Sequence, residues 1–224
     1  MRRPLAILCA EYRRPVVPVL IFLFAMALMA ACIQNDDPNR RGLDQRAQGD
    51  LNGAISTFEG ALGRWPDNAE LHYNLALSWQ DLGVRDDDSR AFEQAANYYA
   101  RALSLSPDIG RAHTNRAIAL AQLERYDESL AQYDQALRQD DTDDRARTNR
   151  ANLRFRQGDL DGALADYEYL ISEKPALWSA HFGAARVYRL RGDDHRARTL
   201  ASHARTLTPD NEAIALIEEF LAEE

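Results

Sequence analysis

The chain begins with one long apolar run and continues as a series of short apolar stripes separated by polar turns. Residues 16–31 (VVPVLIFLFAMALMAA) carry no charge, whereas four arginines and one acid, Glu11, lie before them. From about residue 36 onward, small and apolar residues recur every three or four positions, which is the spacing of amphipathic α-helices. Gly and Pro interrupt these stripes. The pattern therefore predicts many short helices joined by tight turns.

The stripes repeat along the chain with a nearly fixed period. The phrase GDLNGAISTF in the first third of the chain returns as GDLDGALADY in the last third. Equivalent residues lie 34 positions apart, as from Pro175 to Pro209, except for one longer interval of 41 positions from Pro66 to Pro107. A single unit of this size cannot bury its apolar face, so the copies must stack on one another.

These positions resemble the tetratricopeptide repeat, a family of helix-turn-helix units with a period of 34 residues. The small residue in the middle of each first helix is Gly42, Ala76, Ala117, Ala151 or Ala185. The aromatic residue of the second helix is Phe58, Tyr99, Tyr133 or Tyr167. The glycine of the turn between the two helices is Gly49, Gly83, Gly158 or Gly192, with Glu124 as the exception. Small residues let two helices approach closely, and glycine permits the tight turn.

The resemblance implies an all-α fold, a right-handed superhelical α-solenoid of about five repeats closed by a C-terminal capping helix over 212–224. The expected repeats span residues 36–68, 69–109, 110–143, 144–177 and 178–211. We expect the first helix of the first repeat to fray or to begin late, because Pro38 and Gln45 stand where the family has large apolar residues. The second repeat is longer by seven residues around Val84–Arg90, which we expect to form a loop or a helical extension.

The N-terminal segment is typical of export. A basic stretch, an apolar run and small residues before a boundary describe a secretory signal over residues 1–31. The end of the run, Met29-Ala30-Ala31-Cys32, resembles the lipobox of bacterial lipoproteins, although Met29 stands where leucine is usual. The resemblance implies lipidation of Cys32, a short tether over 32–41, and sorting to the outer membrane, since Ile33 is not Asp. An uncleaved membrane anchor and an ordinary cleaved signal remain alternatives.

Composition and motifs argue against catalysis. The net charge of −8 disfavours general nucleic-acid binding. The two cysteines, Cys9 and Cys32, both precede the repeats, so a disulfide framework or Cys-ligated zinc is excluded there. No nucleophile elbow, phosphate loop or zinc-protease motif occurs. His72, His113 and His181 fall at the same position of different repeats, too far apart to share one ion, and are interpreted as packing residues. The sequence predicts no enzyme, metal, cofactor or small-molecule substrate.

A ligand would bind, by the resemblance, on the concave face formed by the first helices. In the last three repeats, five arginines and no acid occupy the inner positions: Arg111, Arg145, Arg156, Arg186 and Arg189. Asn115 and Asn149 recur among them, and Phe182 offers an apolar contact. Because arginine recognises carboxylates, we predict a groove for an extended acidic segment. The alternative is that these arginines pair with neighbouring acids at helix ends. The residues of the family's chaperone-binding carboxylate clamp are largely missing.

The sequence therefore predicts a non-enzymatic scaffold that binds partner proteins in the bacterial cell envelope, facing the periplasm from the outer membrane. One alternative is a single-pass inner-membrane assembly factor for pilus, secretion or peptidoglycan machinery. A second alternative is the regulatory subunit of an envelope enzyme.

Overall fold

The computed structural model of the chain describes residues 37–222, and within them it contains eleven α-helices and no strand. The helices are α2 (Pro38–Ala47), α3 (Leu51–Leu62), α4 (Ala69–Asp86), α5 (Ser89–Leu105), α6 (Ala112–Gln122), α7 (Tyr126–Gln139), α8 (Asp144–Arg156), α9 (Leu160–Glu173), α10 (Trp178–Leu190), α11 (Asp194–Leu207) and α12 (Asn211–Ala222). None of these helices is both long and apolar enough to cross a membrane.

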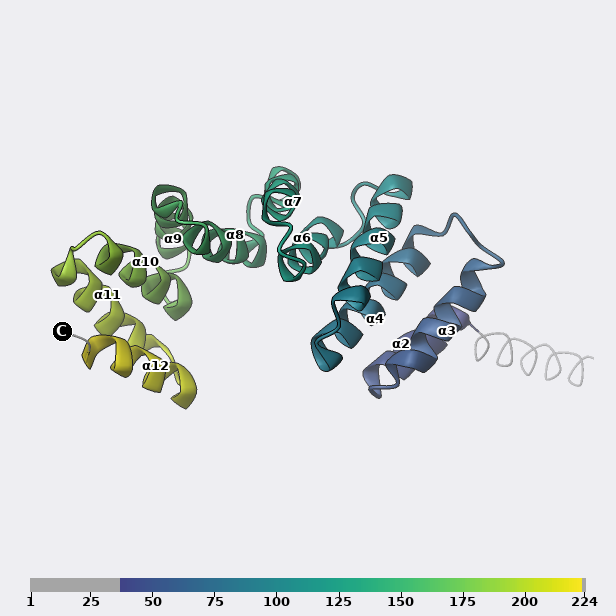
Figure 1. Ribbon diagram of the computed structural model, residues 1–224, viewed down its shortest axis with the longest axis horizontal. Helices are drawn as coiled ribbons and strands as arrows, with labels where there is room; N and C mark the ends of the chain where they lie inside the picture. Colours follow the sequence, from purple (N-terminus) through teal and green to yellow (C-terminus); the bar gives the residue numbers. More distant parts are fainter. Residues whose placement is uncertain (1–36, 223–224) are drawn as a thin grey trace, which may run out of the picture.

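Consecutive helices form antiparallel hairpins that stack in chain order. Contacts join α2 to α3, α4 to α5, α6 to α7, α8 to α9 and α10 to α11, and each hairpin then packs on the next. The stack bends into an arch, with α6, α8 and α10 on its inner side and α7, α9 and α11 on its outer side (Figure 1). Helix α12 packs on α11 and closes the C-terminal end. The predicted all-α solenoid of five repeats with a capping helix is confirmed.

Aspartates and glycines place the helix boundaries. Asp50, Asp159 and Asp193 each stand at an N-cap, where the side chain accepts a hydrogen bond from a backbone N–H of the first turn. The turns before them use Gly49, Gly158 and Gly192 with φ between 76° and 81°, a left-handed conformation that glycine adopts without steric cost. Glu124 takes the same place in the third repeat with φ 58°, so this turn carries a side chain in a strained conformation.

The core lies between each aromatic residue and the small residues that face it. Phe58, Tyr99 and Tyr167 are 0% exposed and Tyr133 is 2% exposed. A Cβ atom at Gly42 would lie 2.5 Å from the ring of Phe58, so α2 and α3 approach too closely for any larger residue. The first helix of the first repeat has 10 residues, whereas α8 has 13, in line with the expected late start.

The longer second repeat is a longer hairpin. Helix α4 has 18 residues and α5 has 17, so the extra residues lengthen both helices and form no loop. The prediction that Gly83 forms the turn is wrong, because α4 continues to Asp86 and the left-handed residue is Asp87, with φ 51°. The Asp88 side chain caps α5 by accepting from the Arg90 N–H. Gly83 faces the ring of Phe92, where a Cβ would lie 3.1 Å away.

Repeat four has a charged interior where repeat two is apolar. The family pattern in the first helix is W-x₂-L-G-x₂-Y. In repeat four its Trp, Leu and Tyr positions are occupied by Arg147, Arg150 and Arg154, around the small residue Ala151. All three guanidiniums converge on the Asp166 side chain, which is 4% exposed, at N···O distances of 3.7, 2.5 and 2.9 Å respectively. We call these four residues the arginine cluster. Burial opposes the charge of Arg150, yet hydrogen bonds to Asp166 and Asp134 keep its pKa above the ordinary value.

Candidate ligand-binding face

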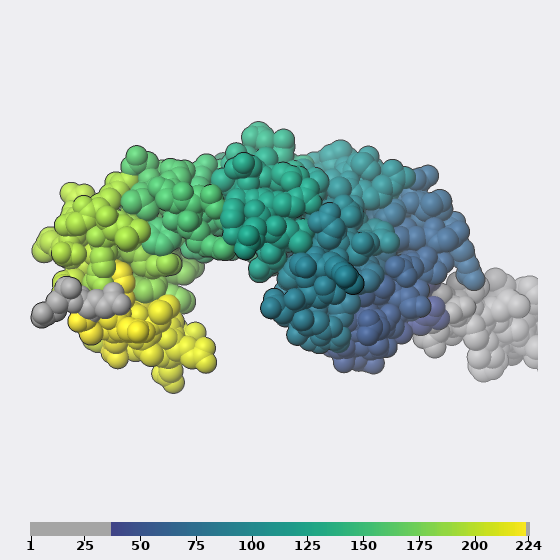
Figure 2. Space-filling model, viewed as in Figure 1, coloured from purple at the N-terminus to yellow at the C-terminus, as the bar shows by residue number. Residues whose placement is uncertain are grey.

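The inner side of the arch carries a hollow between α6 and α8 at the centre of the molecule. It has a volume of about 340 Å³ and is lined by Ile118, Ala121, Gln122, Tyr133, Arg145, Asn149, Asn152, Leu153 and Arg156. The space-filling view shows that this side of the molecule is broadly hollowed (Figure 2). Three of the predicted ligand-binding residues, Arg145, Asn149 and Arg156, therefore lie together in one depression.

Arg145 is held in this hollow by a chain of hydrogen bonds that runs through uncharged side chains of the two preceding repeats. Its Nη1 donates to the Oδ1 atom of Asn115 at 3.3 Å, and the Nδ2 atom of Asn115 donates to the Tyr73 hydroxyl at 3.1 Å. Asn115 is only 3% exposed, so its role is to orient Arg145. The Arg145 side chain remains exposed. Asn149 lines the same hollow, together with Tyr133, whose pKa is raised by burial.

Arg156 and Arg186 are held by aromatic side chains. The Nη2 atom of Arg156 donates to the Tyr126 hydroxyl at 3.2 Å, and its guanidinium carbon lies 5.5 Å from the centre of the Tyr126 ring. The guanidinium carbon of Arg186 lies 4.3 Å above the Phe155 ring. A cation over an aromatic face is attracted by the ring quadrupole while its positive charge persists. Both arginines are exposed and can still bind an anion.

Arg189 and Phe182 pack against the capping helix α12. The guanidinium carbon of Arg189 lies 3.5 Å from the centre of the Phe220 ring, and its Nη1 donates to the Phe220 carbonyl. The Phe182 ring is 7% exposed and meets Phe220 edge to face, with ring centres 5.3 Å apart. Phe182 still lines a second inner hollow of about 320 Å³ together with Arg186, Leu216, Glu219 and Phe220. The sequence did not predict that residues of α12 line this hollow. The available signal was Leu216, an apolar side chain that lies outside the buried face of that helix.

The charges of the inner face are distributed unevenly along the arch. In the first two repeats Arg46 pairs with Asp81 at 2.6 Å, and Glu70 accepts a hydrogen bond from Asn39. Toward the C-terminus, none of Arg111, Arg145, Arg156 and Arg186 has a carboxylate oxygen within 4.0 Å among residues 37–222. The alternative of pairing with neighbouring acids does not hold for these four. Their contacts leave a positive inner surface.

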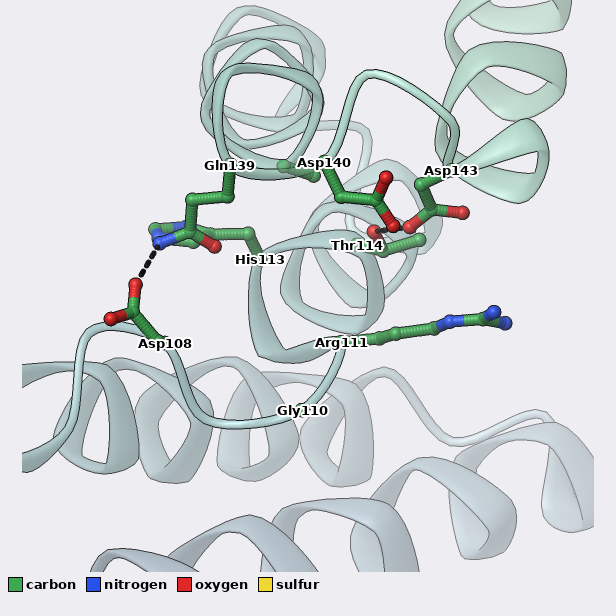
Figure 3. A pocket seen from close by; sticks show the side chains of 9 residues that line it. Asp108, Gly110, Arg111, His113, Thr114, Gln139, Asp140 and Asp143 are labelled. Atoms are coloured by element: carbon green, nitrogen blue, oxygen red, sulfur yellow. Dashed lines mark hydrogen bonds between the residues drawn. The ribbon is translucent and has the colours of Figure 1, made fainter.

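Arg111 lies apart from the others, on the rim. It precedes α6 and borders a hollow of about 260 Å³ that Asp108, Asp140 and Asp143 also line. Figure 3 shows the Arg111 side chain directed away from Asp108 and His113, and shows Asp143 bonded to Thr114 and Asp108 bonded to Gln139.

The carboxylates of this rim hollow have partners within the chain. The hydroxyl and N–H of Thr142 donate to Asp140 and hold its pKa below the ordinary value. Among the described residues, no group of His, Cys, Asp and Glu has the arrangement of a metal site.

The three histidines at the shared repeat position bond either to the end of the preceding repeat or within their own repeat. The Nε2 atoms of His72 and His181 lie 2.8 Å from the carbonyl oxygens of Pro66 and Pro175, and His113 Nδ1 lies 2.8 Å from Gln132 Oε1. They tie each first helix to the preceding loop or to the second helix, in line with the packing interpretation. Cys32, with the predicted leader and most of the tether, lies outside the described residues.

Comparison with known proteins agrees with this architecture. A tetratricopeptide repeat family model matches residues 39–83, 81–144 and 148–212. The chain belongs to the tetratricopeptide repeat family. Members of this family are generally non-enzymatic modules that bind other proteins, so the chain is a protein-interaction scaffold.

Solved structures share the fold at low sequence identity. A MamA crystal structure has a TM-score of 0.67 at 20% identity and covers 74% of this chain and 87% of its own. The structure of YrrB, described as having an unusual peptide-binding site, has a TM-score of 0.67 at 17% identity and covers 85% and 97%. A repeat protein from Parabacteroides merdae has a TM-score of 0.66 at 26% identity and covers 82% and 69%.

Proposed function

We propose that this protein is a scaffold tethered to the bacterial cell envelope, which binds an extended acidic segment of a partner protein along the C-terminal half of its inner face. The single observation that carries the ligand proposal is that Arg145, Arg156 and Arg186 contact only neutral groups there. Their positive charge is thus preorganised, and none of the three forms an ion pair among residues 37–222, although Glu219 lines the hollow of Arg186. Protein or peptide partners suit the family, and YrrB is described as a peptide binder.

The arrangement of the groups suggests the shape of the ligand. Arg145 and Arg156 line the central hollow, and Arg186 lines the next hollow toward α12. An extended chain could place carboxylates against the first two and continue to Arg186. The apolar side chains of Leu216 and Phe220 border the last hollow and would accept an apolar residue at the end of the segment.

The envelope location is supported by the sequence of the N-terminal segment. The apolar run 16–31 ends at Cys32, as the signal of a lipoprotein does. The lipid chains would hold the protein at the membrane and leave the repeats free to bind partners. Cys32→Ser should release the protein from the membrane or leave an unprocessed precursor. An unmodified Cys32 in a full-length, membrane-bound chain would instead favour the uncleaved anchor, and separation of the two membranes would then locate it.

The ligand proposal is tested with the double variant Arg145→Glu/Arg186→Glu. A matched control, Arg90→Glu/Arg138→Glu, reverses two exposed charges outside the inner hollows. Partners captured from envelope extract, and acidic peptides derived from them, should bind the control as well as the parent chain. The double variant should lose binding at least about tenfold with unchanged helicity, and parent binding should weaken as salt rises. Equal capture by all three proteins would place the partner site elsewhere on the surface.

A further inference from the structure

The N-terminal end of the stack presents basic and aromatic side chains. Arg40 and Arg41 lie in the first turn of α2, and Arg64 and Trp65 follow the end of α3. Arg41, Arg64 and Trp65 line one hollow of about 300 Å³, whose lining contains no carboxylate. Arg40 is exposed and lines a second hollow together with Arg41 and Asp44. We call Arg40, Arg41, Arg64 and Trp65 the N-terminal edge.

The pair Arg64-Trp65 has no counterpart in the later repeats. The two residues at the same place in repeats two to five are Leu105-Ser106, Gln139-Asp140, Glu173-Lys174 and Leu207-Thr208. No other copy has an aromatic residue there. Trp65 is 47% exposed, although burial of an indole would be favourable. Trp65 is a large exposed aromatic residue beside arginines, and only the first repeat has it. It therefore indicates a surface that a membrane or another molecule covers.

The place of this edge in the chain suggests what covers it. If the chain is anchored at Cys32, as proposed above, only the four residues 33–36 separate the anchor from the helix cap Asp37, which is five residue-to-residue steps. A fully extended chain of that length spans at most about 17 Å. The N-terminal edge is thus confined to the neighbourhood of the membrane surface and is able to reach it.

We propose that the N-terminal edge lies on the membrane and binds anionic phospholipid headgroups. Arg40 and Arg64 would contact lipid phosphates, and Trp65 would enter the interfacial layer, where tryptophan is enriched in membrane proteins. Among residues 37–222, neither Arg40 nor Arg64 has a carboxylate oxygen within 4.0 Å. Asp37 accepts from the Asn39 N–H as the cap of α2, and Asp44 lines a hollow with Arg40 and Arg41. The contact would fix the orientation of the arch on the membrane, so the inner face would be presented in one direction.

The full chain reconstituted in vesicles provides the test. Trp65 fluorescence is followed in vesicles of phosphatidylcholine and in vesicles that also contain brominated phosphatidylglycerol, with Trp65→Phe to identify its share of the emission. The variant Arg40→Gln/Arg64→Gln is compared with the matched control Arg90→Gln/Arg138→Gln, which removes two exposed charges elsewhere. Vesicle flotation measures the anchoring separately.

The expected result is bromine quenching of Trp65 in the parent and the control. Quenching should fall at least about twofold in Arg40→Gln/Arg64→Gln and at high salt, because both remove the attraction to the lipid charge. All variants should still float with the vesicles. Equal quenching of all variants, or no quenching while the chain floats, would overturn the lipid contact and leave the tether intact. A chain that does not float would overturn the tether itself, and this inference with it.

Discussion

Repeats two and four have the same fold but hold their hairpins together by opposite means. In repeat two the first helix contributes Leu75, which is 0% exposed, to an apolar cluster that Tyr98 also contacts. In repeat four the equivalent residue is Arg150, and the place of Tyr98 is taken by the buried Asp166. Each interior is self-consistent: one excludes charge, and the other balances it with hydrogen-bonded ion pairs.

At the fourth position of the first helix, repeats two to five also pair different side chains across the hairpin. His72 stacks on Tyr98 with ring centres 6.0 Å apart, and His113 bonds to Gln132, which is the equivalent of Tyr98 in repeat three. The guanidinium carbon of Arg147 lies 3.5 Å from the centre of the Tyr169 ring, and His181 meets His203, the equivalent of Tyr169, at 4.6 Å. The repeat thus tolerates very different side chains at these positions. Arg116, the equivalent of Arg150 in repeat three, is an exception, because its buried Nε atom has no hydrogen-bond partner among the described residues.

The largest loss of stability is expected when the buried arginine of repeat four is introduced into repeat two without its aspartate partner. Leu75→Arg would bury a guanidinium in an interior that has no opposing carboxylate, and should cost about 4–5 kcal/mol of unfolding free energy. Adding Tyr98→Asp should recover part of this loss, because it rebuilds the pair found in repeat four. Denaturant unfolding of the two single variants and the double variant measures the coupling. Strictly additive losses would contradict the idea of matched partners.

Removing the shared carboxylate tests repeat four directly. Asp166→Ala leaves Arg147, Arg150 and Arg154 in place without their common anion, and should cost about 3–4 kcal/mol. Asp134→Ala is the matched control, since Asp134 contacts Arg150 alone and its side chain is 40% exposed. The control should lose less than about 1 kcal/mol by chemical denaturation. Similar losses in both would mean that the arginine cluster contributes no more than surface pairs do.

Alkaline pH should weaken both repeats through their buried tyrosines. Burial raises the pKa of Tyr167 to about 12 and also raises that of Tyr99. The unfolded chain therefore releases these protons first, so the stability is complete below about pH 10 and falls as pH rises toward 12. Tyr167→Phe should reduce the fall by about 2 kcal/mol in unfolding measured across this range. An unchanged slope would show that Tyr167 does not titrate in this way.

The smallest effect is expected at the turn of repeat three. Glu124 adopts φ 58°, where the other turns of this type have glycine. Glu124→Gly should raise the stability by about 0.5–1 kcal/mol. The relief of left-handed backbone strain outweighs the larger conformational entropy that glycine loses on folding. Gly158→Ala in repeat four, with φ 80°, is the mirror experiment and should lower stability. Thermal unfolding of both variants measures the difference.

Much of this architecture was accessible from the sequence, because it depends on interactions within one repeat. The period, the small residues such as Gly42 and Ala151, the aromatic of each second helix and the amphipathic last helix predict the hairpins, their number and the cap. The turn at Gly83 was predicted wrongly. A glycine costs a helix only about 1 kcal/mol, which the longer packing of α4 against α5 outweighs.

The inner surface shows what only the tertiary structure decided. The sequence determined that arginines occupy inner positions of the last three repeats, and it determined the apolar segment before Cys32. Whether those arginines pair with acids depends on neighbours about a repeat away: Arg145 meets Asn115 and Arg156 meets Tyr126, each 30 residues earlier. Those contacts are set by the angle at which one hairpin packs on the next, and many side chains share in determining that angle. For the same reason the sequence assigned Arg189 to a ligand, whereas the stacked structure turns it to the carbonyl of Phe220.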